Sequence, residues 1–167
     1  MRLHTWTYGS STGTAVLALH GVRNHGGRFR RLAGDAYPDA WVIAPDLRGH
    51  GRSGWEPPWD VPTHVADLLE TLDAHGVDMP VEVIGHSFGG LIACALAARA
   101  PQRVRSLTLL DPASGLDPAQ CADAAAMDVR GEGRSASWGS VAEAREAWSA
   151  VRPPEGQWGD SGIPVGR

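Results

Sequence analysis

The residues with the clearest chemical potential form a glycine-rich segment around Ser87. Gly85, Ser87 and Gly89 are spaced as Gly-X-Ser-X-Gly, directly after the apolar run 81–84 and directly before a stretch that predicts a helix over 88–100. A serine on a sharp strand-to-helix turn is exposed for attack on a carbonyl carbon. The flanking glycines allow the strand and the helix to approach each other closely. The spacing therefore predicts covalent catalysis with Ser87 as the nucleophile.

Two backbone amides are candidates for stabilising the negative charge that such an attack creates. The Phe88 N–H opens the predicted helix, where unpaired amides and the helix dipole favour an anion. The Val22 N–H follows the apolar run 14–19 and the pair His20-Gly21. Because both amides follow strand ends, we expect them to converge as an oxyanion hole. The residues expected to support this arrangement are His20, Gly21, Gly85, His86 and Gly89.

A serine in a glycine-rich turn can also have a simpler role. Such turns bind phosphate groups, and a serine at the start of a helix can act as an N-cap. The segment around Ser87 lacks the Gly-X-Gly-X-X-Gly spacing, and no Walker lysine follows it. Catalysis is therefore the favoured interpretation of Ser87.

The surrounding sequence alternates between strand and helix patterns. Apolar runs predict strands over 3–8, 14–19, 41–45, 81–84 and 104–110, and helical spacing predicts helices over 26–36, 63–75 and 88–100. The turn at 9–13 predicts a hairpin between the first two strands, and Thr63 is the expected N-cap of the second helix. Helices joining the later strands imply a parallel sheet covered on both faces, with right-handed crossovers. The predicted fold class is α/β, with four parallel strands and one antiparallel strand at the N-terminus.

Composition narrows the remaining possibilities. A chain of 167 residues that is 43% hydrophobic can bury one substantial core. The formal net charge of −4 and the scattered arginines argue against a nucleic-acid partner. The apolar runs fall well short of the roughly 20 residues that span a bilayer. Cys94 and Cys121 suggest neither a zinc site nor a disulfide framework. We expect a cytoplasmic protein with no membrane or nucleic-acid partner.

Three motifs together resemble the α/β-hydrolase fold family. They are His20-Gly21-Val22, then Asp46-Leu47-Arg48-Gly49-His50-Gly51-Arg52-Ser53, then Gly85-His86-Ser87-Phe88-Gly89-Gly90. The resemblance covers residues 1 to about 115, the N-terminal portion of the family's core, and a serine at the turn is similar to the esterase, lipase and peroxidase-like branches. It implies hydrolysis of a small carbonyl substrate, first of all a carboxylic ester, through an acyl-enzyme on Ser87. It implies no metal and no organic cofactor.

The resemblance also implies roles for residues outside the turn. Asp46 and Arg48 are expected to hold the loop that contains them. Asp111 is the candidate triad acid, because some family members carry the acid at that strand end, and the alternative role for Asp111 is to cap the loop before Pro112. Family members insert a helical cap after this strand.

Residues 116–152 are therefore predicted to begin such a cap, and 153–167 an irregular tail. Within 116–152, helices are predicted over 118–129 and 140–151, the second opened by a capping box of Ser140 and Glu143. Trp138 and Trp148 are candidates either for lining a substrate pocket or for packing the cap on the core.

The general base is the part of the machinery that the sequence does not supply. In the family it is a histidine downstream of the acid, whereas this chain has no histidine after His86. Loops place His25 and His50 near the relevant end of the sheet, while His64 and His75 are expected on the surface of their helix. Two interpretations stay open: a serine-dependent hydrolase, or an inactive truncated or frameshifted fragment or binding module.

Two further expectations follow from the same pattern. Hydrolysis of a carbon–carbon bond and perhydrolysis use the same serine turn, so the sequence does not name the substrate. If the chain is truncated, the sheet would keep an uncovered edge, and self-association is then predicted.

Overall fold

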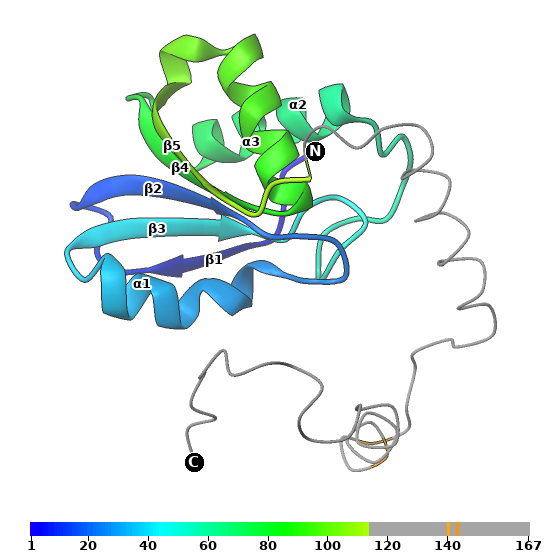
Figure 1. Cartoon of the computed structure of the whole chain (residues 1–167), viewed down its shortest axis with the longest axis horizontal. Coiled ribbons are helices and arrows are strands. Elements are labelled where there is room, and N and C mark those ends of the chain that lie inside the picture. Colours follow the sequence, from blue (N-terminus) through cyan, green and yellow to red (C-terminus); the bar gives the residue numbers. More distant parts are fainter. Residues whose placement is uncertain (114–139, 141–142, 144–167) are drawn as a thin grey trace. The chain divides into compact units, whose positions relative to one another are not determined.

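The computed structural model describes residues 1–113 together with residues 140 and 143 (Figure 1). In chain order the elements are β1 (Thr5–Tyr8), β2 (Thr14–Leu19), a 3-10 helix (Gly26–Phe29), α1 (Arg30–Ala36), β3 (Ala40–Pro45), α2 (Val61–Ala74), β4 (Val81–His86), α3 (Phe88–Arg99), a second 3-10 helix (Pro101–Arg103) and β5 (Val104–Leu110). Every strand and helix predicted up to residue 110 is present, with boundaries shifted by a few residues.

The chain divides into two units, Met1–Asp117 and Pro118–Arg167. The helices predicted over 118–129 and 140–151, and the predicted tail, lie outside the described residues apart from two positions. Those two are Ser140 and Glu143, and the Glu143 N–H donates to the Ser140 Oγ at 3.1 Å. This is one of the two hydrogen bonds that define a capping box.

The five strands form one sheet in the order β1-β3-β2-β4-β5. β2, β3, β4 and β5 are mutually parallel, and β1 is antiparallel to β3. The predicted α/β class and strand directions are confirmed, but the predicted hairpin between β1 and β2 is wrong. β2 is apolar on both faces and lies between two parallel neighbours, with Leu17 paired to Ile43 and to Val83. A strand of that composition belongs at the centre of a sheet, so β1 pairs at the edge instead.

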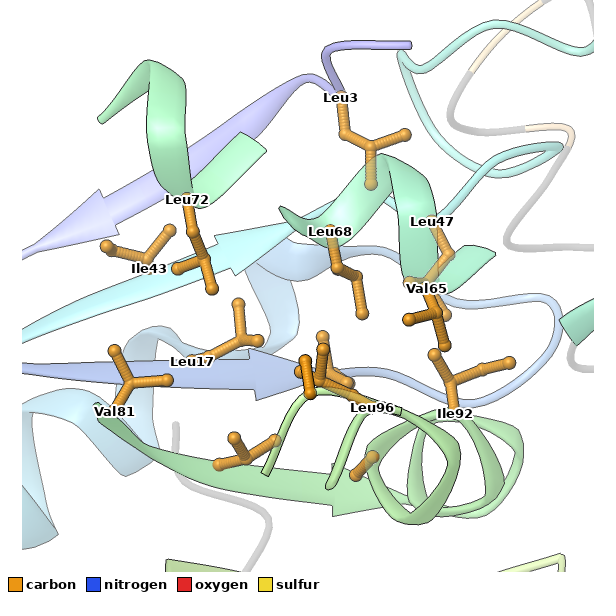
Figure 2. Packing of buried hydrophobic residues seen from close by; sticks show 14 of the residues in the cluster. Leu3, Leu17, Ile43, Leu47, Val65, Leu68, Leu72, Val81, Ile92 and Leu96 are labelled. Atoms are coloured by element: carbon orange, nitrogen blue, oxygen red, sulfur yellow. The ribbon is translucent and has the colours of Figure 1, made fainter. Parts of the chain in front are cut away.

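The alternation of side chains along the strands produces two hydrophobic cores. The strand residues that pack with α2 and α3 include Leu17, Leu19, Ile43 and Val83. Figure 2 labels Leu17 and Ile43 together with Leu68 and Leu72 of α2 and Leu96 of α3. The neighbours of these strand residues point to the opposite face and pack near α1: Val16, Ala18, Val42, Ala44 and Ile84. Helices therefore cover both faces of the sheet, as the sequence predicts, and the central strands are fixed from both sides.

α2 begins two residues before the predicted start. Its N-cap is Asp60, whose Oδ1 accepts the Thr63 N–H at 2.7 Å, and Pro62 lies in the first turn. Proline is tolerated there because amides of the first turn have no partner inside the helix. None of the helices within residues 1–113 is long and apolar enough to cross a membrane.

β5 lies at one edge of the described sheet. Its residues Leu107, Leu109 and Leu110 are between 37% and 40% exposed. An apolar edge strand is a template for further pairing. Self-association through this edge stays a prediction.

Candidate active site

Ser87 occupies a strained turn between β4 and α3. Its backbone angles are φ 52° and ψ −120°, a region that residues other than glycine rarely adopt. The Ser87 N–H donates to the Leu110 carbonyl at 3.0 Å, and the Ser87 carbonyl accepts the Gly90 N–H at 2.9 Å and the Ala113 N–H at 3.0 Å. Strain of this kind persists only where the surroundings impose it. Here α3 and the end of β5 both hold the turn.

The glycines around Ser87 are required by close packing. A β-carbon at Gly85 would lie 2.6 Å from the Gly90 Cα, and one at Gly89 would lie 2.6 Å from the His20 carbonyl oxygen. Gly90, for which the sequence predicts no role of its own, would place a β-carbon 2.7 Å from the Pro112 Cβ. That contact could not be predicted, because it depends on where the chain returns after β5.

Gly21 lies directly beside the nucleophile. A β-carbon at Gly21 would be 3.0 Å from the Ser87 Cβ and 3.1 Å from the His86 Nδ1. Gly21 follows β2, and β2 pairs with β4 in parallel, so both motifs reach the same end of the sheet. The structure therefore brings the His20-Gly21-Val22 motif and the Ser87 turn together.

His20 fixes the orientation of the peptide that carries the Val22 amide. Its Nε2 accepts the Leu47 N–H at 2.9 Å, so the ring proton is on Nδ1, which donates to the Gly21 carbonyl at 2.8 Å. The Gly21 carbonyl and the Val22 N–H belong to one trans peptide and point in opposite directions. Consequently His20 directs the Val22 N–H away from the core.

Burial keeps His20 uncharged. The residue is 1% exposed, and desolvation lowers its pKa from 6.5 to about 4. The unfolded chain therefore takes up a proton at this histidine as the pH falls through about 6.5, whereas the folded chain does so only near pH 4. The stability that the neutral ring maintains is complete above pH 7 and is lost as the pH falls towards 4.

We expect the lowered pKa of His20 alone to reduce the free energy of unfolding by about 2 kcal/mol when the pH falls from 7 to 5. Urea unfolding at both pH values checks it, with His20→Gln as the comparison, because His64 and His75 are retained in both proteins. The variant should lose about 2 kcal/mol less on acidification. Equal losses in the two proteins would show that His20 titrates normally.

The Val22 and Phe88 amides are the two predicted oxyanion donors. Phe88 is the first residue of α3, so its N–H has no acceptor inside the helix. Within residues 1–113, no group accepts a hydrogen bond from either amide. The Val22 residue is 59% exposed. Two donors without an acceptor among the described residues therefore flank Ser87, one next in sequence and one reached through Gly21.

The loop that contains Asp46 and Arg48 is held as the sequence predicts. Asp46 accepts the Gly26 N–H at 2.7 Å and the Trp6 Nε1–H at 2.9 Å through Oδ1, and the Arg52 N–H at 2.9 Å through Oδ2. The carboxylate therefore joins β1, the first 3-10 helix and its own loop.

Arg48 forms a buried ion pair with Asp67 of α2. The Nε donates to Oδ2 at 2.7 Å and the Nη2 donates to Oδ1 at 2.8 Å. The Met1 amino group also contacts Asp67. Burial favours a raised pKa for the Asp67 carboxyl, but these cationic donors outweigh it and the pKa is lowered. Asp67 is not among the residues predicted from the sequence. The signal that could have revealed it is a set of polar residues at helical spacing among the apolar positions of the same helix, namely His64, Asp67 and Thr71.

Asp111 lies beside the Ser87 turn. It has a left-handed backbone, with φ 46°, and directly follows β5. Its neighbour Leu110 accepts the Ser87 N–H, and Ala113 donates to the Ser87 carbonyl. The Asp111 side chain has no hydrogen bond to another described residue. The structure thus places Asp111 at the end of β5 beside the Ser87 turn without joining it to a histidine, and its role as the acid stays a prediction.

The structure describes all seven histidines and none of them hydrogen-bonds the Ser87 hydroxyl. His4 and His25 pack on Trp6, and His75 packs on Trp41, so these three contact other aromatic groups. The other four histidines are His20, His50, His64 and the exposed His86.

The expected surface position of His64 is wrong. His64 is 1% exposed, on the same side of α2 as the buried Leu68. The helix pattern did not reveal this, because a histidine in an amphipathic helix is compatible with either face.

The chain belongs to the alpha/beta hydrolase fold family, which it matches over residues 14–137. It is 42% identical to Lipase LipV of Mycobacterium tuberculosis over 153 residues, which cover 91% of this chain and 58% of that protein. It is 44% identical to the pimeloyl-[acyl-carrier protein] methyl ester esterase of Chromobacterium violaceum over 110 residues, 66% of this chain and 41% of the relative.

A solved marine microorganism esterase has the same fold. Its TM-score is 0.75 at 24% identity, over 92% of this chain and 59% of that structure. The chain therefore spans about three fifths or less of the length of these relatives.

Proposed function

We propose that this chain supplies the nucleophile and the oxyanion hole of a serine-dependent hydrolase of small carboxylic esters. The observation that carries the proposal is the strained backbone of Ser87 at the start of α3, with Gly21 packed against its Cβ. Family membership supports a hydrolase. The relatives named as a lipase and as a methyl ester esterase support an ester as the substrate.

In the proposed reaction the Ser87 Oγ attacks the ester carbonyl carbon and loses its proton to a base. The carbonyl π electrons move to oxygen, and the Val22 and Phe88 N–H groups hold the resulting oxyanion. As this intermediate collapses, the base returns the proton to the leaving oxygen, so that the alcohol departs and an acyl group stays on Ser87. Water then removes the acyl group as the carboxylic acid and restores the serine. Loss of one oxyanion donor typically lowers the rate by about 100- to 1,000-fold. Loss of either backbone amide would therefore slow the reaction severely even if Ser87 were unchanged.

The remaining parts of the proposal concern Asp111 and the domain organisation. Asp111 is proposed as the acid that orients the base, since it follows β5 next to the Ser87 turn. Residues 1–115 are proposed as the hydrolase core, 116–152 as part of a cap over the site and 153–167 as an irregular tail.

A second candidate is a binding module or an inactive hydrolase. It is favoured by one observation: all histidines of the chain lie at or before position 86, and none hydrogen-bonds Ser87. In such a protein the two amides would still bind a carbonyl or carboxylate oxygen, but no acyl-enzyme would form.

Labelling with a fluorophosphonate probe separates the two candidates. The hydrolase predicts one covalent adduct on the full chain, detected by intact mass, and complete loss of this adduct in Ser87→Ala. Ser10→Ala, in the exposed turn after β1, is the matched control and should be labelled as the unmodified chain is. A chain that is folded by circular dichroism but carries no Ser87-dependent adduct would support the binding module instead.

A further inference from the structure

Three imidazoles and the Phe88 ring form a row of aromatic contacts in the order His20, His50, Phe88, His64. The rings of His20 and His50 meet edge to face with centroids 5.1 Å apart, and His50 stacks on Phe88 at 6.5 Å with an interplanar angle of 27°. His64 meets Phe88 from α2 at 5.2 Å and 81°. Within the described residues no group of histidine, cysteine or acidic side chains is arranged to hold a metal ion. The cluster therefore needs another explanation.

His64 differs from the other two rings because its Nδ1 is buried without a hydrogen-bond partner among the described residues. His20 has partners for both nitrogens, and the Nδ1–H of His50 donates to the Arg48 carbonyl at 3.0 Å. The Nδ1 of His64 is buried and has no hydrogen-bond partner in the described part of the chain. A buried nitrogen without a hydrogen bond lowers the stability of a protein, whereas an apolar group of the same shape does not carry this cost. A phenylalanine would fill such a position more stably.

We propose that His64 is a positioning residue for the oxyanion hole, holding Phe88, and with it the Phe88 N–H, through a neutral imidazole. This inference rests on the proposed function of the Phe88 amide. The ring of His64 contacts the Phe88 side chain at the first turn of α3. A shift of the His64 ring would therefore shift Phe88, whose backbone N–H is the proposed oxyanion donor. His20 orients the Val22 amide in the same region. A different histidine thus positions each of the two backbone donors.

Protonation would disturb the contact between His64 and Phe88. A charged imidazole carries protons on both nitrogens, and the buried Nδ1 has no acceptor for one within the part of the chain that the structure describes. The charged or titratable groups that influence His64 are Asp60 and Asp67 of its own helix and Arg48 and His50 of the preceding loop. Asp67 is already paired with Arg48. α3 contributes the uncharged Phe88, and burial lowers the pKa of His64.

Nuclear magnetic resonance of the full chain tests this without requiring catalysis. We expect the Phe88 amide signal to shift with the midpoint at which the His64 ring titrates, and His64→Phe to abolish that transition. His75→Phe is the matched control, because His75 also meets an aromatic ring, Trp41, edge to face at 5.7 Å. It should leave the Phe88 transition unchanged. A His64 titration that leaves the Phe88 amide unmoved would overturn the proposal.

The rate of fluorophosphonate labelling gives the second measurement. His64→Ala should react about tenfold more slowly at pH 7.5, a fraction of the roughly 100-fold or greater loss expected when a donor is removed. His64→Phe should restore the rate and make it less sensitive to acid. Equal rates in His64→Ala and the unmodified chain would contradict the positioning role. If no protein is labelled, the proposed function fails, while the amide titration still decides whether His64 holds Phe88.

Discussion

Replacing Asp67 by alanine is expected to lower the free energy of unfolding by about 3–5 kcal/mol. The Asp67 carboxylate is nearly inaccessible to solvent, with 2% of its side chain exposed, and it holds Arg48, whose side chain is 10% exposed. Removing the carboxylate leaves a guanidinium in the protein interior without its counter-charge. Since whole domains are stable by only about 5–15 kcal/mol, this single change would remove a large part of the stability.

Urea unfolding followed by circular dichroism measures this loss. Asp35→Ala is the matched control, because Asp35 pairs with Arg31 on the surface of α1 with side chains 70% and 78% exposed. It should cost less than about 1 kcal/mol. Combining Asp67→Leu with Arg48→Met removes both charges and should recover much of the loss. A loss of similar size in the Asp35 and Asp67 variants would show that burial of the Arg48 pair is unimportant.

The parts of the site that depend on local backbone requirements could be predicted from the sequence. Gly85 and Gly89 flank Ser87 because a strand, a turn and a helix are packed within a few residues and leave no room for side chains there. A short sequence motif is enough to predict this requirement. The loop role of Asp46 and Arg48 was implied by the family motif, whereas their partners Trp6 and Asp67 lie in other elements and were not predicted. Period-two and helical spacing likewise predicted the strands, the helices and the α/β class.

Features that depend on distant segments could not be predicted in the same way. β1 pairs with β3 rather than with β2, since the choice of partner is decided by the whole sheet. Asp67 is buried against Arg48, and His64 is buried against Phe88. Helical periodicity alone predicts neither contact. Gly90 is required by Pro112, which returns to the turn only after β5.

Replacing Gly89 by alanine is expected to cost about 3 kcal/mol or more and to leave much of the chain unfolded. The added β-carbon would overlap the Leu19 carbonyl and would lie 2.6 Å from the His20 carbonyl oxygen. Neither oxygen can yield, because β2 is the central strand, hydrogen-bonded to β3 and β4, and Leu19 is fully buried. The helix must therefore move away from the sheet, and Ser87 and Phe88 would move with it.

Gly34→Ala is the control that isolates this packing effect from the general consequences of replacing a glycine in a helix. Gly34 lies in α1, and a β-carbon there would have no atom within 4 Å. Alanine at that position should stabilise the chain by about 0.5–1 kcal/mol, because it restricts the unfolded backbone and favours a helix. The two substitutions are chemically identical, so opposite signs in thermal unfolding can arise only from their surroundings. A Gly89→Ala protein as stable as the unmodified chain would mean that α3 does not pack against the end of β2, and the proposed convergence of the two oxyanion donors would fail with it.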